Sequence, residues 1–489
     1  MLKLWPFVGG VHLEEPTLEV SQLAVLQPLL PKQLIYPLAM RDGANANPKV
    51  KPGERVLKGQ AIAADGRLFP PIHAASSGQV REIAPRTLPH PSGLSGECII
   101  IDVDGEDESV ESQGIADFTQ IEPAVLREKI HAAGIVGLGG AAFPTALKLD
   151  PPRQATLDTL VLNGAECEPY IRCDDSLLRH TPHDVLGGAK VLMHVLGVSR
   201  CLLAVEDTMQ DAISRLENAQ GEGDYKGIQI VPVPSIYPMG GERQLIKTLT
   251  GREVPAEGIP AQIGVVCFNV GTAAAVYQAI VGGEPLMSRI VTVTGRGVRK
   301  PQNLLARIGS PIADLVEFCG GYTDSAYRLI MGGPMMGFSL PSDEPPITKA
   351  TNCILVAGQG ELAGEKPVMP CIRCGACATA CPASLLPQQL YWHARAGDLE
   401  RVMDYHLSAC IECGCCDMVC PSHIPLVQSF RSAKSKVVAK AQERLNAEHA
   451  RLRYESRQER INRENREKAE NAKRKKALLA KKLDNQKAP

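Results

Sequence analysis

Residues 371–382 read CIRCGACATACP, and residues 410–421 read CIECGCCDMVCP. Each stretch has the spacing Cys-x2-Cys-x2-Cys-x3-Cys-Pro, so one pattern occurs twice within a short region. Nine of the 16 cysteines of the chain lie in this region, between Cys371 and Cys420. Three thiolates on a tight loop can face one common centre, while the fourth is directed away and the proline fixes the exit of the chain. The pattern therefore predicts two neighbouring metal centres.

This spacing is typical of bacterial ferredoxins with two [4Fe–4S] clusters. The expected pairing is crossed, because the fourth cysteine of each stretch binds the cluster of the other. The predicted ligand sets are Cys371, Cys374, Cys377 and Cys420 for one cluster, and Cys381, Cys410, Cys413 and Cys416 for the other. A pair of structural zinc sites with four thiolates each is the alternative, although zinc does not require this doubled spacing. Cys415 fits neither set, and we expect it to be a thiol that binds no metal.

The composition indicates a globular protein with several domains. The chain has 489 residues, of which 44% are hydrophobic and 22% charged, and domains usually have ~100–200 residues. No uninterrupted apolar run reaches the ~18 residues that a membrane span needs. Residues 1–10 are too short and too broken by Pro and Gly for a signal peptide, so we expect a cytoplasmic chain without disulfides. Residues 440–489 are basic, with 16 Lys and Arg against 8 Asp and Glu.

Patterns outside the cysteine region predict a multidomain protein of mixed α/β and α+β class. Short apolar runs and glycine turns in residues 48–83 indicate small antiparallel strands joined by tight turns, and their order resembles that of a barrel-sandwich, lipoyl-like domain. Apolar runs that alternate with helical stretches indicate a Rossmann-like α/β domain. The expected order is a barrel-sandwich domain (1–118), an α/β domain (119–285), a β-grasp module (286–365), an α-helical ferredoxin domain (366–430) and a charged tail (431–489), helical or disordered.

A glycine-rich stretch marks a candidate site in the α/β domain. Residues 134–149 read GIVGLGGAAFPTALKL, and residues 163–170 read NGAECEPY. Glycines let backbone N–H groups approach a phosphate, and a following helix N-terminus attracts an anion. The alternative is an ordinary tight turn from strand to helix. Residues 163–170 follow a predicted strand, where polar groups can face a flat ring.

The stretches 237–242 (YPMGGE) and 268–272 (FNVGT) complete a series of four segments. In this order, the series resembles the FMN- and NADH-binding subunit of respiratory complex I over about residues 120–340. The resemblance implies a flavin-phosphate site of Gly137, Gly139, Gly140 and Lys148. It also implies that Asn163, Glu166 and Glu168 lie beside the isoalloxazine and nicotinamide rings, and that Gly241, Glu242, Asn269 and Thr272 line the remaining wall. Ala165, Arg243, Phe268 and Leu149 depart from the pattern of that subunit.

Over nearly its whole length, including the basic tail, the chain resembles the RnfC (RsxC) family, whose members are subunits of the Rnf (Rsx) ion-translocating oxidoreductases. The resemblance implies a peripheral electron-transfer subunit on the cytoplasmic face of the inner membrane, within an NADH:ferredoxin-type oxidoreductase and translocase. Its cofactors would be FMN and two [4Fe–4S] clusters, with NADH as substrate, and its partners other subunits of the complex and ferredoxin-type carriers. A flavin exchanges hydride with nicotinamide and single electrons with clusters, so no acid–base or nucleophilic residue is required.

Two alternatives remain at this point. A soluble flavin–iron–sulfur NADH diaphorase would have the same catalytic parts but would not be a subunit of a complex. A zinc-stapled adaptor with a nucleic-acid-binding tail would have neither clusters nor flavin. Glutamates interspersed among the basic residues of the tail favour a solvated helix, so we expect no nucleic-acid partner.

Overall fold

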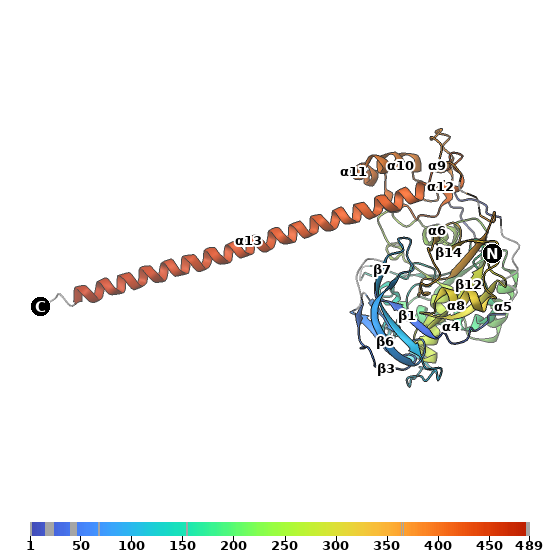
Figure 1. Cartoon of the computed structure of the whole chain (residues 1–489), viewed down its shortest axis with the longest axis horizontal. Coiled ribbons are helices and arrows are strands. Elements are labelled where there is room, and N and C mark those ends of the chain that lie inside the picture. Colours follow the sequence, from blue (N-terminus) through green and yellow to red (C-terminus); the bar gives the residue numbers. More distant parts are fainter. Residues whose placement is uncertain are drawn as a thin grey trace. The chain divides into compact units, whose positions relative to one another are not determined.

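A computed structural model describes residues 2–14, 24–39, 46–66, 69–152, 155–362, 364 and 366–485. It contains two compact units, Met1–Gln388 with Ala409–Pro425, and Gln389–Ser408 with Leu426–Pro489. Figure 1 shows the chain and labels some of the elements of both units. Within the described ranges, no helix combines the length and the apolar character needed to cross a membrane.

Two antiparallel sheets form the N-terminal domain. One has the order β1 (Gln33–Pro37), β7 (Ser95–Val103), β6 (Gly78–Thr87) and β3 (Arg55–Val56). The other has the order β2 (Asn47–Pro48), β4 (Ala61–Asp65) and β5 (Phe69–His73). Leu34, Ile99 and Ile101 of the first sheet share one buried core with Ile62 and Phe69 of the second. The short strands and glycine turns of the sequence thus produce two small sheets that face one core.

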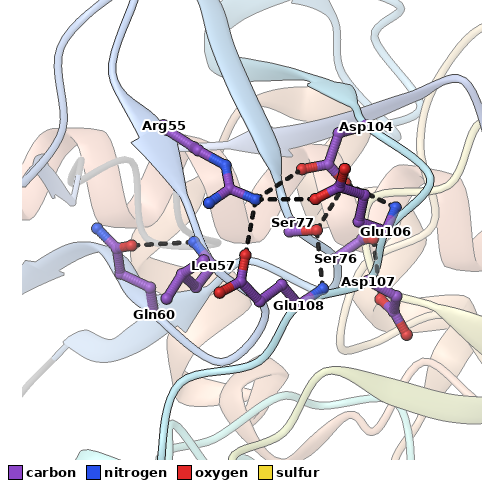
Figure 2. Close-up of polar contacts among 9 residues, drawn as sticks. All are labelled: Arg55, Leu57, Gln60, Ser76, Ser77, Asp104, Glu106, Asp107 and Glu108. Carbon is purple, nitrogen blue, oxygen red and sulfur yellow. Dashed lines mark hydrogen bonds and ion pairs between the residues drawn. The ribbon is translucent and has the colours of Figure 1, made fainter.

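An ion pair joins this domain to the third domain of the same unit. Arg307, at the end of β13 (Gln302–Arg307), donates to both carboxylate oxygens of Asp107 at 2.6 and 2.8 Å. Next to Asp107, the Arg55 guanidinium contacts three further carboxylates, Asp104, Glu106 and Glu108 (Figure 2). The Arg307 side chain is mostly buried, so its two-pronged contact fixes the geometry of the joint better than an exposed pair would.

A four-stranded parallel sheet is the centre of the second domain. Its order is β10 (Ile228–Val233), β9 (Arg200–Glu206), β8 (Thr159–Gly164) and β11 (Val265–Asn269). Strand β8, which comes first in the chain, therefore lies between β9, the second, and β11, the last. The winding of the chain reverses between β8 and β11, and ligand sites of open α/β sheets lie at such a point.

Helices cover both faces of this sheet. Successive residues of a strand point to opposite faces, and here the residues on both faces are apolar. Leu160 and Leu162 pack with Val185 and Leu186 of α4, whereas Val161 packs with α6. The helices of the domain are α1 (Pro123–Ala132), α2 (Thr145–Lys148), α3 (Cys173–His180), α4 (Pro182–Leu196), α5 (Gln210–Glu222), α6 (Glu242–Thr250) and α7 (Val270–Tyr277). Short helical turns at Phe118–Gln120, Pro260–Ile263 and Gln278–Gly282 connect them.

The third domain is a five-stranded mixed sheet with one helix. The strand order is β13, β12 (Ser288–Thr294), β16 (Cys353–Gly358), β14 (Ala326–Met331) and β15 (Phe338–Ser339), and its central pair, β12 and β16, is parallel. Helix α8 (Ile312–Phe318) packs through Ile312, Leu315 and Val316 against Val291 and Val293 of β12.

The cysteine region contains short helices and little other regular structure. Helix α9 (Ala376–Thr379) lies in the first cysteine stretch, and α12 (Cys415–Met418) in the second. The predicted helical insert between them forms α10 (Pro387–Ala396), α11 (Leu399–Asp404) and a short turn at Leu407–Ala409.

The charged tail forms α13 (Leu426–Asn485), a single helix of 60 residues that Figure 1 shows in full. From residue 435 to residue 479 the helix is almost wholly exposed. Lys440 and Arg444 of α13 lie 4.0 and 3.8 Å from Glu400 of α11. Of the two predicted states of the tail, helical and disordered, the described residues have the helical one.

Candidate functional site

The four segments singled out in the sequence meet at the carboxyl ends of β8 and β11. Asn163 and Asn269 are partners in the parallel ladder. The Asn163 side chain donates to the Gly240 carbonyl oxygen at 2.8 Å. Gly139 lies so close to Asn269 that a Cβ on the glycine would be 3.3 Å from the asparagine Cβ. The reversal of winding at this edge thus assembles four segments that are far apart in the sequence.

The glycine loop is held at both ends and leaves backbone donors available. The Leu138 N–H donates to the Thr272 hydroxyl at 2.9 Å, which ties the loop to α7. Among the described residues, none accepts a hydrogen bond from the N–H groups of Gly139, Gly140 or Ala141. Gly140 has φ +98° and open space where a side chain would start. Free N–H groups on an uncrowded glycine loop fit an anionic phosphate.

Lys148 faces a second predicted cofactor residue. Its amine lies 2.5 Å from a carboxylate oxygen of Glu242, the first residue of α6, and 5.5 Å from the centre of the Phe268 ring. Both side chains of the ion pair are partly exposed. The amine is therefore accessible to a bound anion, which would share it with the Glu242 carboxylate.

Glu166 accepts hydrogen bonds from the start of α3. Its oxygens accept the backbone N–H groups of Asp174 and Asp175 at 3.0 and 3.1 Å, and the Cys173 thiol at 3.1 Å. Burial, followed by the neighbouring Asp174 charge, raises the pKa of Glu166 to about 8. Burial also raises the pKa of Asp174 to about 6. The Asn269 side chain donates a hydrogen bond to Asp174 at 2.5 Å, which acts in the opposite direction on this pKa. This pair therefore carries less than its full negative charge at neutral pH.

Glu168 is directed to a different domain. One of its oxygens accepts the backbone N–H groups of Met335 and Met336, at 2.7 and 2.9 Å, in the loop between β14 and β15. Gly333 lies against the carboxylate, where a Cβ would collide with it. Glu166 and Glu168 both engage backbone donors, and neither has a hydrogen bond to the glycine loop within the described ranges.

The four cysteines of the second predicted ligand set lie close together. Burial raises the pKa of the Cys416 thiol, and the charges of Asp417, Cys413, Cys410 and Cys381 raise it further. Helix α9 of the first stretch contacts α12 of the second, and Ala380, next to Cys381, shares an apolar cluster with Cys413 and Cys415. The first predicted set is more open, since Cys374 is exposed and Cys371, Cys377 and Cys420 are half-buried. The ligand assignment itself stays a prediction.

Among the described residues, Glu166, Cys173 and Asp174 form a group of possible metal ligands whose ligand atoms lie within 4.8 Å of one another, and this group contains none of the predicted cluster cysteines.

Two buried cations next to the site were not predicted from the sequence. Arg289 donates to the carbonyl oxygens of Lys349 and Leu138, at 2.5 and 2.9 Å, and so supports the glycine loop from the third domain. The Lys349 amine donates to the carbonyls of Pro71 and Gly134 at 2.8 and 2.7 Å, and burial lowers its pKa to about 7. A single charged residue in an apolar run gives no sequence signal of such a role.

Four domain families match the chain in sequence order. They are the RnfC barrel sandwich hybrid domain at residues 5–106, the Nuo51 FMN-binding domain at 130–278, the SLBB domain at 290–339 and the 4Fe-4S dicluster domain at 370–424. The protein is thus a multidomain chain with a barrel-sandwich, an FMN-binding, an SLBB and a ferredoxin domain. The FMN-binding and dicluster matches support FMN and [4Fe–4S] clusters as its cofactors.

Curated relatives agree with the domain matches. The RnfC-type subunit of the ion-translocating oxidoreductase complex of Yersinia pestis bv. Antiqua is 45% identical over 463 residues, which cover 94% of this chain and 74% of the relative. The chain belongs to the RnfC family of ion-translocating oxidoreductase complexes. The Pseudomonas aeruginosa member is 47% identical over 465 residues, covering 95% of this chain but 60% of the relative. The predicted resemblance to this family is therefore confirmed, and the chain spans about three fifths of the Pseudomonas relative's length.

Among solved structures, an NAD⁺-reducing [NiFe]-hydrogenase in the H2-reduced state is similar in part. It is 21% identical, with a TM-score of 0.45, and the match covers 66% of this chain and 61% of the hydrogenase chain.

Proposed function

We propose that this protein is the electron-transfer subunit of a membrane-bound Rnf-type complex, in which electron flow between NADH and ferredoxin-type carriers drives ion translocation. It would bind peripherally on the cytoplasmic face of the inner membrane, together with other subunits. One observation carries this proposal: a flavin-type phosphate loop and eight cysteines with dicluster spacing lie in the same compact unit.

The proposed residue roles follow the geometry of the site. In the loop that begins at Gly137, the backbone N–H groups of Gly139 and Gly140, with the Lys148 amine, would hold the flavin phosphate, whereas the Gly137 N–H donates to the Phe143 carbonyl oxygen and so shapes the loop. Asn163, Glu166 and Glu168 would lie toward the isoalloxazine and nicotinamide rings, and Gly241, Glu242, Asn269 and Thr272 would line the rest of the pocket. When bound, FMN converts a two-electron hydride transfer into single-electron steps that clusters can accept.

The finer fold assignments belong to the same proposal. The parallel order β10-β9-β8-β11 supports a Rossmann-like second domain. The order β13-β12-β16-β14-β15, with a parallel central pair and one covering helix, supports a β-grasp third domain. In both domains, loops at the ends of strands contain residues of the candidate flavin site or contact them.

Anaerobic purification followed by iron, sulfide and flavin analysis tests this function. We expect about eight irons and about eight sulfides per chain, as two [4Fe–4S] clusters require, together with one FMN. Lys148→Ala should weaken FMN binding by roughly 10- to 100-fold, because a charge-assisted hydrogen bond contributes ~1.5–3 kcal/mol. Lys129→Ala, at an exposed position on α1, is the matched control and should bind FMN as the parent does.

The outcomes separate the alternatives. A colourless, zinc-loaded preparation would contradict the proposal and favour an adaptor protein. A brown, flavin-containing protein that reduces acceptors with NADH, but never co-purifies with membrane subunits, would favour a soluble diaphorase. Equal FMN affinity of the Lys148 and Lys129 variants would remove Lys148 from the phosphate site.

A further inference from the structure

Tyr237 connects the candidate flavin site to the second cysteine stretch. The side chain is buried, and its hydroxyl donates to the Cys413 carbonyl oxygen at 2.6 Å. The ring belongs to a small apolar cluster with Ala380, Cys413 and Cys415, against which Met335 packs. A buried hydroxyl that donates to a loop carbonyl fixes the position of that loop, since breaking the bond would leave both polar groups unpaired.

Further contacts hold the chain around Cys381, another cysteine of the same ligand set. Gln244, on α6, is buried and donates to the Pro382 carbonyl oxygen at 3.0 Å, one residue after Cys381. The Gly10 N–H donates to the Ala380 carbonyl oxygen at 3.0 Å, one residue before Cys381. The chain on either side of Cys381 is therefore held by two segments, α6 of the domain that contains the candidate flavin site and the N-terminal segment around Gly10.

Two of these anchors, Tyr237 and Gln244, flank the predicted flavin-wall residues Gly241 and Glu242 in the sequence. Three residues after Tyr237, the Gly240 carbonyl accepts from Asn163, and the Gly240 N–H donates to the Cys167 sulfur at 3.2 Å. Gln244 follows Glu242 by two residues on α6. The same short segment therefore faces the candidate flavin site at one end and the second cysteine ligand set at the other.

Among the described residues, the first ligand set is more exposed than the second. Cys374 is exposed, and so are the nearby side chains of Met369 and Ile372. In the second set, Cys381, Cys413 and Cys416 are buried and Cys410 is half-buried. The two predicted ligand sets therefore differ in their exposure to solvent.

We propose that the cluster held by Cys381, Cys410, Cys413 and Cys416, called here the inner cluster, is the first to receive electrons from the flavin, and that Tyr237 is the positioning residue that sets this approach. The cluster of Cys371, Cys374, Cys377 and Cys420, called the outer cluster, would pass them outward. This inference rests on the proposed function. It follows because electron transfer slows steeply as the distance between donor and acceptor grows.

The electron count is balanced by the proposed reactants. NADH would give a hydride, which is two electrons and one proton, to the bound flavin and would leave as NAD⁺. The reduced flavin would pass one electron to the inner cluster, which would pass it to the outer cluster and from there to a ferredoxin-type carrier. The second electron would follow the same route, and the flavin would release the proton that it received to water.

Single-cluster variants of the full chain test the order. Cys374→Ala removes an outer ligand and Cys410→Ala an inner one, and reduction by dithionite first confirms that each variant keeps its other cluster. After mixing with NADH, we expect the inner cluster of Cys374→Ala to be reduced at the parent rate. The outer cluster of Cys410→Ala should be reduced at least tenfold more slowly. Equal rates, or the reverse order, would overturn the proposal.

Pulsed EPR gives a readout that does not depend on NADH. In chemically half-reduced protein, magnetic coupling between the flavin radical and a reduced cluster should be stronger in Cys374→Ala than in Cys410→Ala. If NADH reduces the flavin in neither variant, the proposed substrate is wrong, yet the coupling still decides which cluster is nearer. Stronger coupling in Cys410→Ala would refute the order of the clusters.

Tyr237→Phe tests the positioning role, with Tyr327→Phe as control because Tyr327 is exposed. Both variants should keep the parent's iron and flavin content. We expect Tyr237→Phe alone to slow electron transfer from flavin to inner cluster by roughly two- to tenfold and to weaken the coupling. A purely structural role would lower the melting temperature without changing that rate in the folded protein, and such a result would rule out positioning by Tyr237.

Discussion

The two cysteine stretches have the same backbone and different surroundings. Arg373 and Glu412, at equivalent positions, both have φ +58°, and Gly375 and Gly414 have φ +81° and +82°. Each glycine is followed by a four-residue helix. Yet Cys374 is exposed and its equivalent, Cys413, is buried. The cysteine spacing and the glycine determine the shape of each loop, whereas contacts from distant segments determine its exposure.

The largest effect that we expect from this difference in exposure is on the rate at which each cluster is lost. A cluster that solvent reaches is open to oxidants and chelators, whereas a packed shell restricts their access. In air with an iron chelator, we expect the outer cluster to lose iron at least tenfold faster than the inner one, followed by their separate EPR signals. Loss of both signals at one rate would show that the difference in burial has no chemical effect.

Gly375 and Gly414, at equivalent positions of the two stretches, allow a second comparison, with a smaller expected effect. Alanine at either position adopts a left-handed conformation, at a cost of ~1–2 kcal/mol. A Cβ at Gly375 would meet nothing within 4 Å, but one at Gly414 would lie 3.0 Å from the Met335 carbonyl oxygen. Gly414→Ala should therefore destabilise the protein by about 1 kcal/mol more than Gly375→Ala. Thermal unfolding of the two variants measures this difference, and equal melting temperatures would argue against close packing at the second loop.

The smallest expected effect concerns Cys415, whose equivalent in the first stretch is Ala376. Cys415 is buried and is predicted to bind no metal. Cys415→Ala makes this position match the first stretch, and we expect about eight irons per chain to remain, with a stability loss of ~1 kcal/mol from the missing buried sulfur. Iron analysis and thermal unfolding check both expectations. A drop to about four irons would instead identify Cys415 as a ligand.

Local patterns in the sequence predicted the parts that depend on spacing. The repeated cysteine pattern indicated clusters before any fold was known, and the dicluster domain match supports them. The apolar run before residues 163–170 predicted a strand there, and β8 occupies Thr159–Gly164. Both signals lie within short windows of sequence, where spacing alone determines geometry.

Contacts between segments that are far apart in the sequence could not be predicted from such local patterns. Nothing near Glu166 in the sequence indicates that its carboxylate accepts the first N–H groups of α3, since that depends on how the chain turns after β8. Arg289 and Tyr237 act through carbonyl groups of segments more than 100 residues away. Backbone carbonyls are present at every residue, so the sequence cannot show which one a buried side chain will meet.

The contact between Gly10 and Ala380 has a consequence for biosynthesis. Gly9 and Gly10 both have positive φ, and side chains there would collide with the backbones of Cys381 and Tyr237. The ribosome makes Gly10 long before Ala380, so the contact between them can form only after the first cysteine stretch has been translated. Hydrogen bonds of the same segment with Tyr237 and Thr248 can form earlier, so the docking of residues 5–11 can be completed only in stages.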